Sequence, residues 1–281
     1  MNDPSANNEP YPAGPSTTRT HHQGAFTIAS RKLPILKAGP IDALSARLGI
    51  PVPEMIFGDN LVSVAHPRTG WQVSFSAEPA LDTVDKTGEA GMLRVAYAKE
   101  WSSSREKTSA GISEVVRPFD WSYSCAYRGD EVPGRAGERL GRAGAGEEIP
   151  LELLKRRDPI LFADEVVLYE SELDDNGISV LSVKVRVMEQ RMLLLCRLFM
   201  RLDNVLVRVR DTRVYVDFGT EVVMREYTAR EDKFENVKRN LYMTGLMPDG
   251  VTAALRDPNE VANLLPVVEH SLESVCLAQP S

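Results

Sequence analysis

Residues 164–230 read DEVVLYESELDDNGISVLSVKVRVMEQRMLLLCRLFMRLDNVLVRVRDTRVYVDFGTEVVMREYTAR, and they contain five runs of β-forming residues in succession. Each run is separated from the next by only two to five residues, LDDNG, EQ, LDN and DFGT in turn, and such links are typical of turns. A link this short cannot form the crossover that a parallel pair of strands requires. The pattern therefore predicts an antiparallel meander of five strands.

The third run, RMLLLCRLFMR at residues 191–201, is apolar at both odd and even positions. A strand with this pattern lies in the centre of a sheet and has both faces covered. Helices are the expected cover, and the candidates are residues 150–157, 232–243, 258–265 and 266–275. Alternating runs at 61–66 and 70–76 add N-terminal strands. The predicted fold class is α+β, a single domain built on a large antiparallel sheet covered by helices.

Composition separates one ordered domain from three other segments. Residues 1–23 are rich in Pro, Asn, Ser and Thr and hold too little apolar surface to offset the entropy of ordering, so we expect a mobile arm. Residues 129–148, GDEVPGRAGERLGRAGAGEE, are expected to be a flexible Gly-rich insert for the same reason. The domain itself is expected to extend over residues 24–275, and residues 276–281 form a short tail.

The 281 residues carry a net charge of −7 and have a pI of about 5.3. This acidic balance disfavours nucleic acid and anionic membrane surfaces as partners. No apolar run approaches the roughly 18 residues of a membrane-spanning helix, and the N-terminal stretch lacks the apolar run of a signal peptide. We therefore expect a cytoplasmic protein, with the nucleus as a second compartment.

No catalytic or cofactor site emerges from the motifs. The three cysteines are widely spaced and are not grouped with histidines at metal-ligand spacings. The GRAGAG run at residues 141–146 lacks the following Lys-Ser/Thr of a phosphate-binding loop. The motifs therefore give no support for catalysis, and no metal or cofactor is expected. A hydrolase with Asp120, Asp211 or His66 as its base is the less favoured alternative.

The fourth run, VLVRVRDTRVYV at residues 205–216, changes its pattern in the middle. Its odd positions are apolar up to Val209, the next odd position is Asp211, and the apolar residues then continue at even positions. A carboxylate in a buried row costs several kcal/mol unless it is paired. Two interpretations are open. Asp211 pairs with Arg213 or Arg225 at a strand kink, or a β-bulge presents Asp211 and Arg213 at a binding surface.

Seven sequence blocks resemble the TIP41-like family in order and spacing. They are PEMIFGDN (53–60), KEWSSSR (99–105), RPFDWSYS (117–124), FADEVVLYESELDDNGISVLSVKVRVM (162–188), RDTRVY (210–215), MREYTAREDK (224–233) and DPNEVANLLPV (257–267). The resemblance runs from about residue 24 to residue 275 and leaves out the N-terminal arm and the Gly-rich insert.

The resemblance implies a non-catalytic regulator that binds the catalytic subunit of type 2A-like serine/threonine phosphatases and modulates its activity in TOR signalling. It also implies an antiparallel sheet with helices and a groove that accepts the C-terminal tail of the phosphatase. The alternative left open is a scaffold that associates mainly with a Tap42-type phosphatase adaptor through its helical exterior.

The resemblance also implies positions of partner contact. Ile149, Val209 and Asp211 match family positions implicated in phosphatase contact, and Val209 stands where relatives carry Met. Pro79 stands where relatives carry an Asp that makes a further contact. Arg213, which accompanies Asp211 in the bulge interpretation, completes the predicted partner-binding set. On this interpretation Asp211 faces a partner and not the core.

Overall fold

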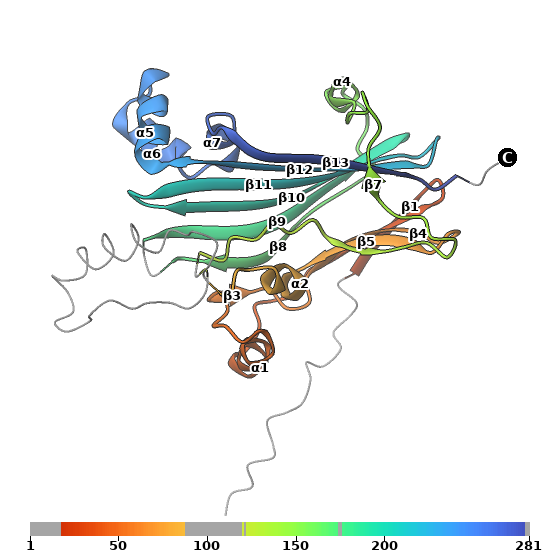
Figure 1. Ribbon diagram of the computed structural model, residues 1–281, viewed down its shortest axis with the longest axis horizontal. Helices are drawn as coiled ribbons and strands as arrows, with labels where there is room; N and C mark the ends of the chain where they lie inside the picture. The colour runs from red at the N-terminus through yellow and green to blue at the C-terminus, as the bar shows by residue number, and fades with distance from the viewer. Residues whose placement is uncertain (1–17, 88–119, 121, 174–175, 279–281) are drawn as a thin grey trace, which may run out of the picture.

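The computed structural model describes residues 18–87, 120, 122–173 and 176–278, and in these ranges two antiparallel sheets pack face to face (Figure 1). The large sheet has the strand order β3 (Met55–Ile56), β8 (Phe162–Ser171), β9 (Gly177–Val187), β10 (Arg191–Leu202), β11 (Leu206–Asp217), β12 (Val222–Lys233), β13 (Val267–Cys276) and β7 (Gly141–Arg142). The small sheet has the order β1 (Thr18–Gln23), β2 (Phe26–Arg31), β4 (Leu61–His66), β5 (Trp71–Ser76) and β6 (Asp130–Val132). The first 17 residues of the predicted arm and the last three of the predicted tail lie outside the described residues.

The helices divide between the two sheets. They are α1 (Ala38–Leu48), α2 (Ala77–Asp82), α4 (Leu151–Leu154), α5 (Phe234–Met243), α6 (Pro248–Ala254) and α7 (Pro258–Ala262). Helices α1 and α2 lie on the side of the small sheet, whereas α4 to α7 lie beyond the large sheet (Figure 1). The predicted α+β class, a single domain centred on a large antiparallel sheet, is confirmed.

The predicted five-strand meander is also confirmed. Strands β8 to β12 follow one another along the chain, and each is antiparallel to its neighbours. Because the hairpin links are short, they fix the register of each pair. The register aligns the side chains of β10, β11 and β12 in rows that cross the sheet.

The main core lies between the two sheets. Leu194 and Leu198 of β10 point into it, as do Val64 and Val73 of the small sheet. We call this side of the large sheet the inner face and the opposite side the outer face. The prediction that helices cover both faces of β10 is wrong for the inner face. The N-terminal strands each have an apolar side of their own, and burying that side against the large sheet removes both surfaces from water.

The changed pattern of β11 follows from this layering. Val207 and Val209 lie on the outer face in a cluster with the C-terminal helices, whereas Val214 and Val216 lie on the inner face in the main core. Strand β11 pairs with β10 and β12 in unbroken register over its whole length. The predicted bulge at Asp211 is therefore wrong. The apolar residues change position because the two ends of the strand are covered on opposite faces.

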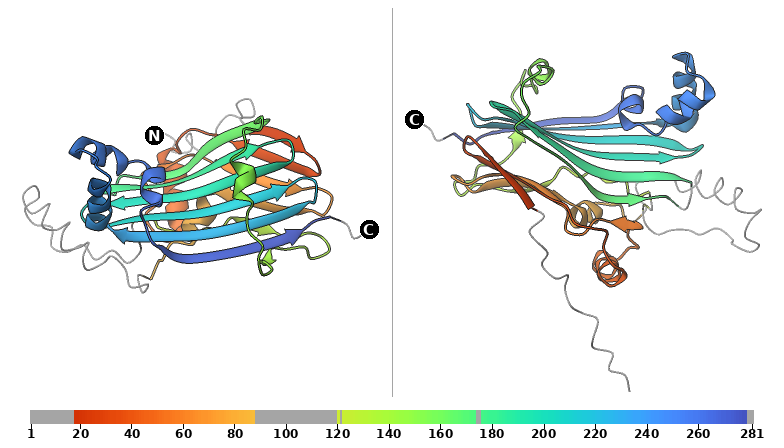
Figure 2. Two further views of the ribbon diagram at one scale, coloured as in Figure 1. Left: turned by 90° about the horizontal axis from the view of Figure 1, so that it is seen from above. Right: turned by 180° about the vertical axis from the view of Figure 1, so that it is seen from behind.

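Two buried apolar clusters of the described residues lie at opposite ends of the outer face. Helices α5 to α7 lie over one end and α4 over the other (Figures 1 and 2). At one end α5, α6 and α7 pack on Val207 and Val209, and we call this the helix cluster. At the other end Ile149, just before α4, packs against Tyr215 and Met224, and we call this the α4 cluster. A polar strip of the sheet lies between the two clusters.

The Gly-rich insert at residues 129–148 is ordered, contrary to the prediction. Its β6 pairs with β5 and its β7 pairs with β13, so the insert passes from the small sheet to the large sheet. Glu131 Oε1 accepts hydrogen bonds from the indole nitrogen of Trp71 (2.8 Å) and from the backbone nitrogen of Leu140 (2.7 Å). Hydrogen bonds hold most of the insert in place, and such bonds do not require apolar side chains. The low apolar content of the segment therefore led to the wrong prediction of disorder.

Two further predictions are wrong at strand edges. Residues 18–23, which were assigned to the mobile arm, form β1 and pair with β2. Arg19 also binds Asp164 of the large sheet at 3.2 Å, so polar contacts order a segment with little apolar surface. Residues 266–275 were expected to be helical, but Val267–Cys276 is strand β13. The free edge of β12 offers this segment a row of backbone hydrogen bonds, which outweighs its weak helical pattern.

His66 joins the β4–β5 hairpin to the loop between β11 and β12. Its side chain is fully buried, its Nδ1 lies 2.9 Å from Thr69 Oγ1, and its Nε2 lies 3.4 Å from Glu221 Oε2. Burial lowers the pKa of His66 below the usual 6.5, and the carboxylate of Glu221 offsets only part of this effect. Near pH 6 the folded chain therefore holds this imidazole in its neutral form more strongly than the unfolded chain does.

We expect the free energy of unfolding to fall between pH 7 and pH 5 in part because of His66. Below its usual pKa of 6.5 the unfolded chain takes up a proton that the folded chain resists, so stability is lost as the pH falls and is constant above that range. His66→Gln should show a smaller loss when urea unfolding is compared at the two pH values. An equal loss in the variant would assign the pH dependence to other groups.

Candidate functional site

The polar strip on the outer face is a row of charged side chains that crosses β10 to β13. The cross-strand register sets Arg197 of β10 opposite Asp211 of β11, and Arg213 of β11 opposite Glu226 of β12. His270 of β13 completes the row. Side chains directly opposite each other on neighbouring strands are close enough to pair, so the register itself produces an alternation of charge.

Asp211 is the most deeply buried member of the row, with 0% of its side chain exposed. Arg197 donates to both of its oxygens, from Nε to Oδ1 at 2.6 Å and from Nη2 to Oδ2 at 2.7 Å. Arg213 Nη2 adds a longer contact to Oδ2 at 3.5 Å. The interpretation that an arginine pairs with Asp211 is thus right in kind, but the main partner is Arg197. Arg225 instead binds Glu273 at 2.8 Å.

Glu226 continues the row toward the sheet edge. Arg213 Nη1 donates to its Oε2 at 2.6 Å, and His270 Nε2 lies 3.1 Å from its Oε1. Burial alone would raise the pKa of Glu226, but the hydrogen bonds from Arg213 and His270 outweigh it and lower the pKa below the usual 4.5. The carboxylate therefore stays ionised at neutral pH and keeps its ion pair with Arg213.

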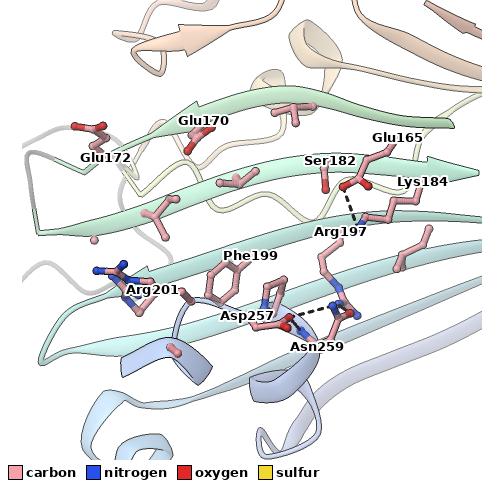
Figure 3. Close-up of a pocket in the computed structure, with 18 of the residues that line it drawn as sticks. Glu165, Glu170, Glu172, Ser182, Lys184, Arg197, Phe199, Arg201, Asp257 and Asn259 are labelled. Atoms are coloured by element: carbon pink, nitrogen blue, oxygen red, sulfur yellow. Dashed lines mark hydrogen bonds and ion pairs between the residues drawn. The ribbon is translucent and has the colours of Figure 1, made fainter. Parts of the chain in front are cut away.

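A groove of about 940 Å³ lies beside the row, over the outer face of β8, β9 and β10 and next to α6 and α7 (Figure 3). We call it the outer groove. Its lining combines apolar side chains (Val167, Ile178, Val180, Leu195, Phe199), carboxylates (Glu165, Glu170, Glu172, Asp203, Asp257) and cations (Lys184, Arg197, Arg201, Arg256). Its volume lies within the range of typical ligand sites, and its lining fits a peptide segment with both apolar and polar side chains.

Arg197 connects the outer groove with both the row and α7. Besides its two bonds to Asp211, it donates from Nη1 to Asn259 Oδ1 at 2.8 Å. Asp257 in turn accepts from the backbone nitrogen of Asn259 at 2.8 Å and caps the start of α7. The guanidinium is thereby fixed between the sheet and the helix, at the wall of the groove (Figure 3).

The structure brings four of the five predicted contact residues to one face. Val209, Asp211 and Arg213 share the outer face of β11, and Ile149 packs on the same face in the α4 cluster. Of these, Arg213 has the most exposed side chain, at 24%, whereas Asp211 has none exposed. Pro79 lies in α2, which packs on β5 of the small sheet, so it does not join them. The role of all five residues in partner contact stays a prediction.

Sequence reasoning missed Arg197 and Asn259. A signal for Arg197 exists, because it is a lone charge inside an otherwise apolar run. The short loop at residues 203–205 also fixes the hairpin register, and a count outward from it places Arg197 opposite Asp211. Asn259 has no comparable signal, because its contact depends on where α7 docks.

The three residues considered as bases for a hydrolase do not converge. Asp211 is on the outer face, whereas His66 packs against Phe26 in the core and Asp120 faces Arg208 at 4.0 Å. In the described part of the chain, no group of three or more His, Cys, Asp or Glu side chains is placed to hold a metal ion. No helix among the described residues is long and apolar enough to span a membrane.

Comparison with known proteins gives a consistent result. The model of the TIP41-like family matches residues 55–238. The chain is 37% identical over 265 residues to "Type 2A phosphatase activator TIP41" of Saccharomyces cerevisiae, covering 89% of this chain and 72% of that protein. It is 36% identical over 255 residues to the "TIP41-like protein" of Homo sapiens, covering 90% and 87%. It is 31% identical over 248 residues to "Type 2A phosphatase activator tip41" of Schizosaccharomyces pombe, covering 88% and 94%.

Proposed function

The chain belongs to the TIP41-like family, and on that basis we propose that it is a non-catalytic regulator of type 2A-like serine/threonine phosphatases. It binds the phosphatase catalytic subunit through the outer face of its large sheet. The names of the two yeast relatives, both type 2A phosphatase activators, support the link to this class of enzyme.

The outer face is the observation that carries the proposal. It combines an open groove and a row of paired charges, with a buried apolar cluster at either end. Four of the five residues predicted for partner contact map to it: Arg213 is partly exposed, and Ile149, Val209 and Asp211 are buried beneath this face. Leu151 of α4 is exposed beside the α4 cluster and adds an apolar side chain to this face. A stable complex buries roughly 1,200 Å² or more in total, which calls for contacts along this whole surface.

In this proposal the outer groove accepts the C-terminal tail of the catalytic subunit as an extended segment. Strand β9, which forms the middle of the floor, is already paired along both edges, by β8 and by β10. The tail is therefore held by side chains and not by addition of a strand to the sheet. Ile178, Leu195 and Phe199 supply apolar contacts for its side chains, and the charges of the groove fix its direction.

Regulation then follows from occupancy. A catalytic subunit whose tail and adjoining surface are held here is not free to bind its other subunits in the same way, so this chain changes which phosphatase complexes form. We place this regulation in TOR signalling and in the cytoplasm, with the nucleus as a second compartment. Fractionation of cells that express the tagged chain tests the compartment.

The alternative partner is a Tap42-type adaptor. It is favoured by apolar side chains exposed where α5 ends and α6 begins, since Met243 is 80% exposed and Met247 is 75% exposed. Large exposed apolar side chains that cluster on a surface mark sites of protein interaction. Binding of the purified adaptor in the absence of any phosphatase, and loss of that binding in Met243→Asp/Met247→Asp, would favour the alternative.

Co-purification tests the main proposal. The full chain is mixed with each type 2A-like catalytic subunit, either intact or lacking its last few residues. We expect the intact subunits to bind and the truncated ones to bind at least about tenfold more weakly, since the groove contacts are lost. Equal binding of intact and truncated subunits would show that the outer groove does not hold the tail. No binding of either form would contradict the proposed function itself.

A further inference from the structure

We infer that Arg197 is the residue that hydrogen-bonds the phosphatase in the outer groove, and that Asp211 is a positioning residue that acts through it. The inference rests on the proposed function and deepens it. It reverses the expectation that Asp211 itself contacts the partner. The ligand that Arg197 recognises is an oxygen acceptor, a carboxylate or a main-chain carbonyl, on the bound segment.

The burial of Asp211 excludes a direct contact in this arrangement. None of its side chain is exposed, and both of its oxygens accept hydrogen bonds from Arg197. A partner that reached Asp211 would have to displace Arg197. This would leave a guanidinium without its counter-charge inside the protein, which is strongly unfavourable.

Arg197 has the geometry of a recognition residue. A guanidinium has five N–H donors, and within the described residues Asp211 receives two of them and Asn259 one. Two donors, one on each terminal nitrogen, remain for a ligand. The side chain is 13% exposed and lines the groove. Because three hydrogen bonds already fix its orientation, little rotational freedom is lost when a ligand binds.

The neighbours of Arg197 define what surrounds the acceptor. Leu195 and Phe199 flank it on the outer face of β10, and both line the groove. A bound segment that presents an oxygen to Arg197 therefore places apolar side chains on either side of that oxygen. Asp211 neutralises much of the charge of Arg197, so recognition depends on hydrogen-bond geometry more than on net charge.

A double-mutant cycle tests the inference. The affinity of the full chain for a purified type 2A-like catalytic subunit is measured for the wild type, Arg197→Lys, Asp211→Asn and the double variant. Lysine keeps the positive charge but lacks the planar fork, so Arg197→Lys should lower affinity by about tenfold or more. Asp211→Asn should also lower affinity. The double variant should bind within about twofold of Arg197→Lys, because both variants lack the guanidinium that Asp211 positions.

Arg225→Lys is the matched control. Arg225 is an equally buried arginine that binds Glu273 at 2.8 Å, but it lies on the inner face of β12. Its substitution should lower the melting temperature about as much as Arg197→Lys does while leaving affinity unchanged. This comparison separates recognition from a purely structural role, which would affect both variants alike.

Three outcomes would overturn the inference. Additive losses in the double variant would show that Asp211 contacts the partner independently. An unchanged affinity in Arg197→Lys, with normal binding by the wild type, would remove Arg197 from the interface and leave the proposed function intact. Failure of the wild-type chain to bind any type 2A-like catalytic subunit would contradict the proposed function and this inference together.

Discussion

Asp211→Leu is expected to lower the free energy of unfolding by about 3 kcal/mol, which for a chain of this size corresponds to a fall of roughly 6–12 °C in Tm. The substitution removes the carboxylate that accepts hydrogen bonds from Arg197 at 2.6 and 2.7 Å. Arg197 then lies without its counter-charge in a site where its side chain is only 13% exposed. Thermal and urea unfolding measure the loss.

The double variant Arg197→Met/Asp211→Leu provides the control. Both charges are gone, and apolar side chains of similar size fill the space, so stability should return close to that of the wild type. Phosphatase affinity should stay reduced, because the guanidinium at position 197 is gone from the groove. An Asp211→Leu chain that melts with the wild type would contradict the buried ion pair itself.

Glu131→Ala is expected to lower the free energy of unfolding by about 2–4 kcal/mol, because each buried donor that loses its acceptor costs about 1–3 kcal/mol. The two donors are the indole of the fully buried Trp71 and the backbone nitrogen of Leu140. The insert should also detach locally, so trypsin should cleave after Arg135 and Arg139 faster than in the wild type. Urea unfolding and timed proteolysis report the two effects.

Two substitutions in the same segment calibrate this result. Glu131→Gln keeps one acceptor oxygen and should cost much less than Glu131→Ala. Glu138→Ala removes a partly exposed carboxylate whose Oε2 accepts from the backbone nitrogen of Ala136 at 3.0 Å, and it should change stability by less than about 1 kcal/mol. Unchanged trypsin cleavage in Glu131→Ala would mean that Glu131 does not hold the insert in place.

Strand β11 shows how far a hydrophobic pattern can predict layers. Alternation identifies Val207, Val209, Val214 and Val216 as buried, and all four are. It does not say which neighbour buries them, because period two only separates the faces of a strand. The bulge was inferred to keep one buried face, whereas two different layers cover the two ends of the strand.

The wrong predictions have a common physical origin. In residues 266–275 the apolar residues Val268, Leu272 and Val275 are spaced by four and three, which is the period of a helix, and the edge of β12 overrides this local signal. The insert has few apolar residues, but Glu131 ties it to Trp71. In both places hydrogen bonds to residues distant in the sequence determine the structure. Local composition cannot predict such bonds.

The candidate site was predictable only in part. The pattern change at Asp211 pointed to the right place on the right strand, and a count from the short β10–β11 loop would have found its partner, Arg197. The family resemblance implied a groove, but residue patterns did not predict its place, because its far wall is formed by the docking of α6 and α7. Nor was the separation of Pro79 from the other contact residues, since the second sheet was unforeseen.

Site-specific photo-crosslinking tests the binding face most directly. A photoreactive side chain replaces Ser182, which lines the outer groove on β9, and in a second variant Gln72 on β5 of the small sheet. Each variant is mixed with a purified type 2A-like catalytic subunit and irradiated. The expected result is a crosslinked complex from position 182 and none from position 72. A crosslink from position 72 alone would contradict the assignment of the outer face.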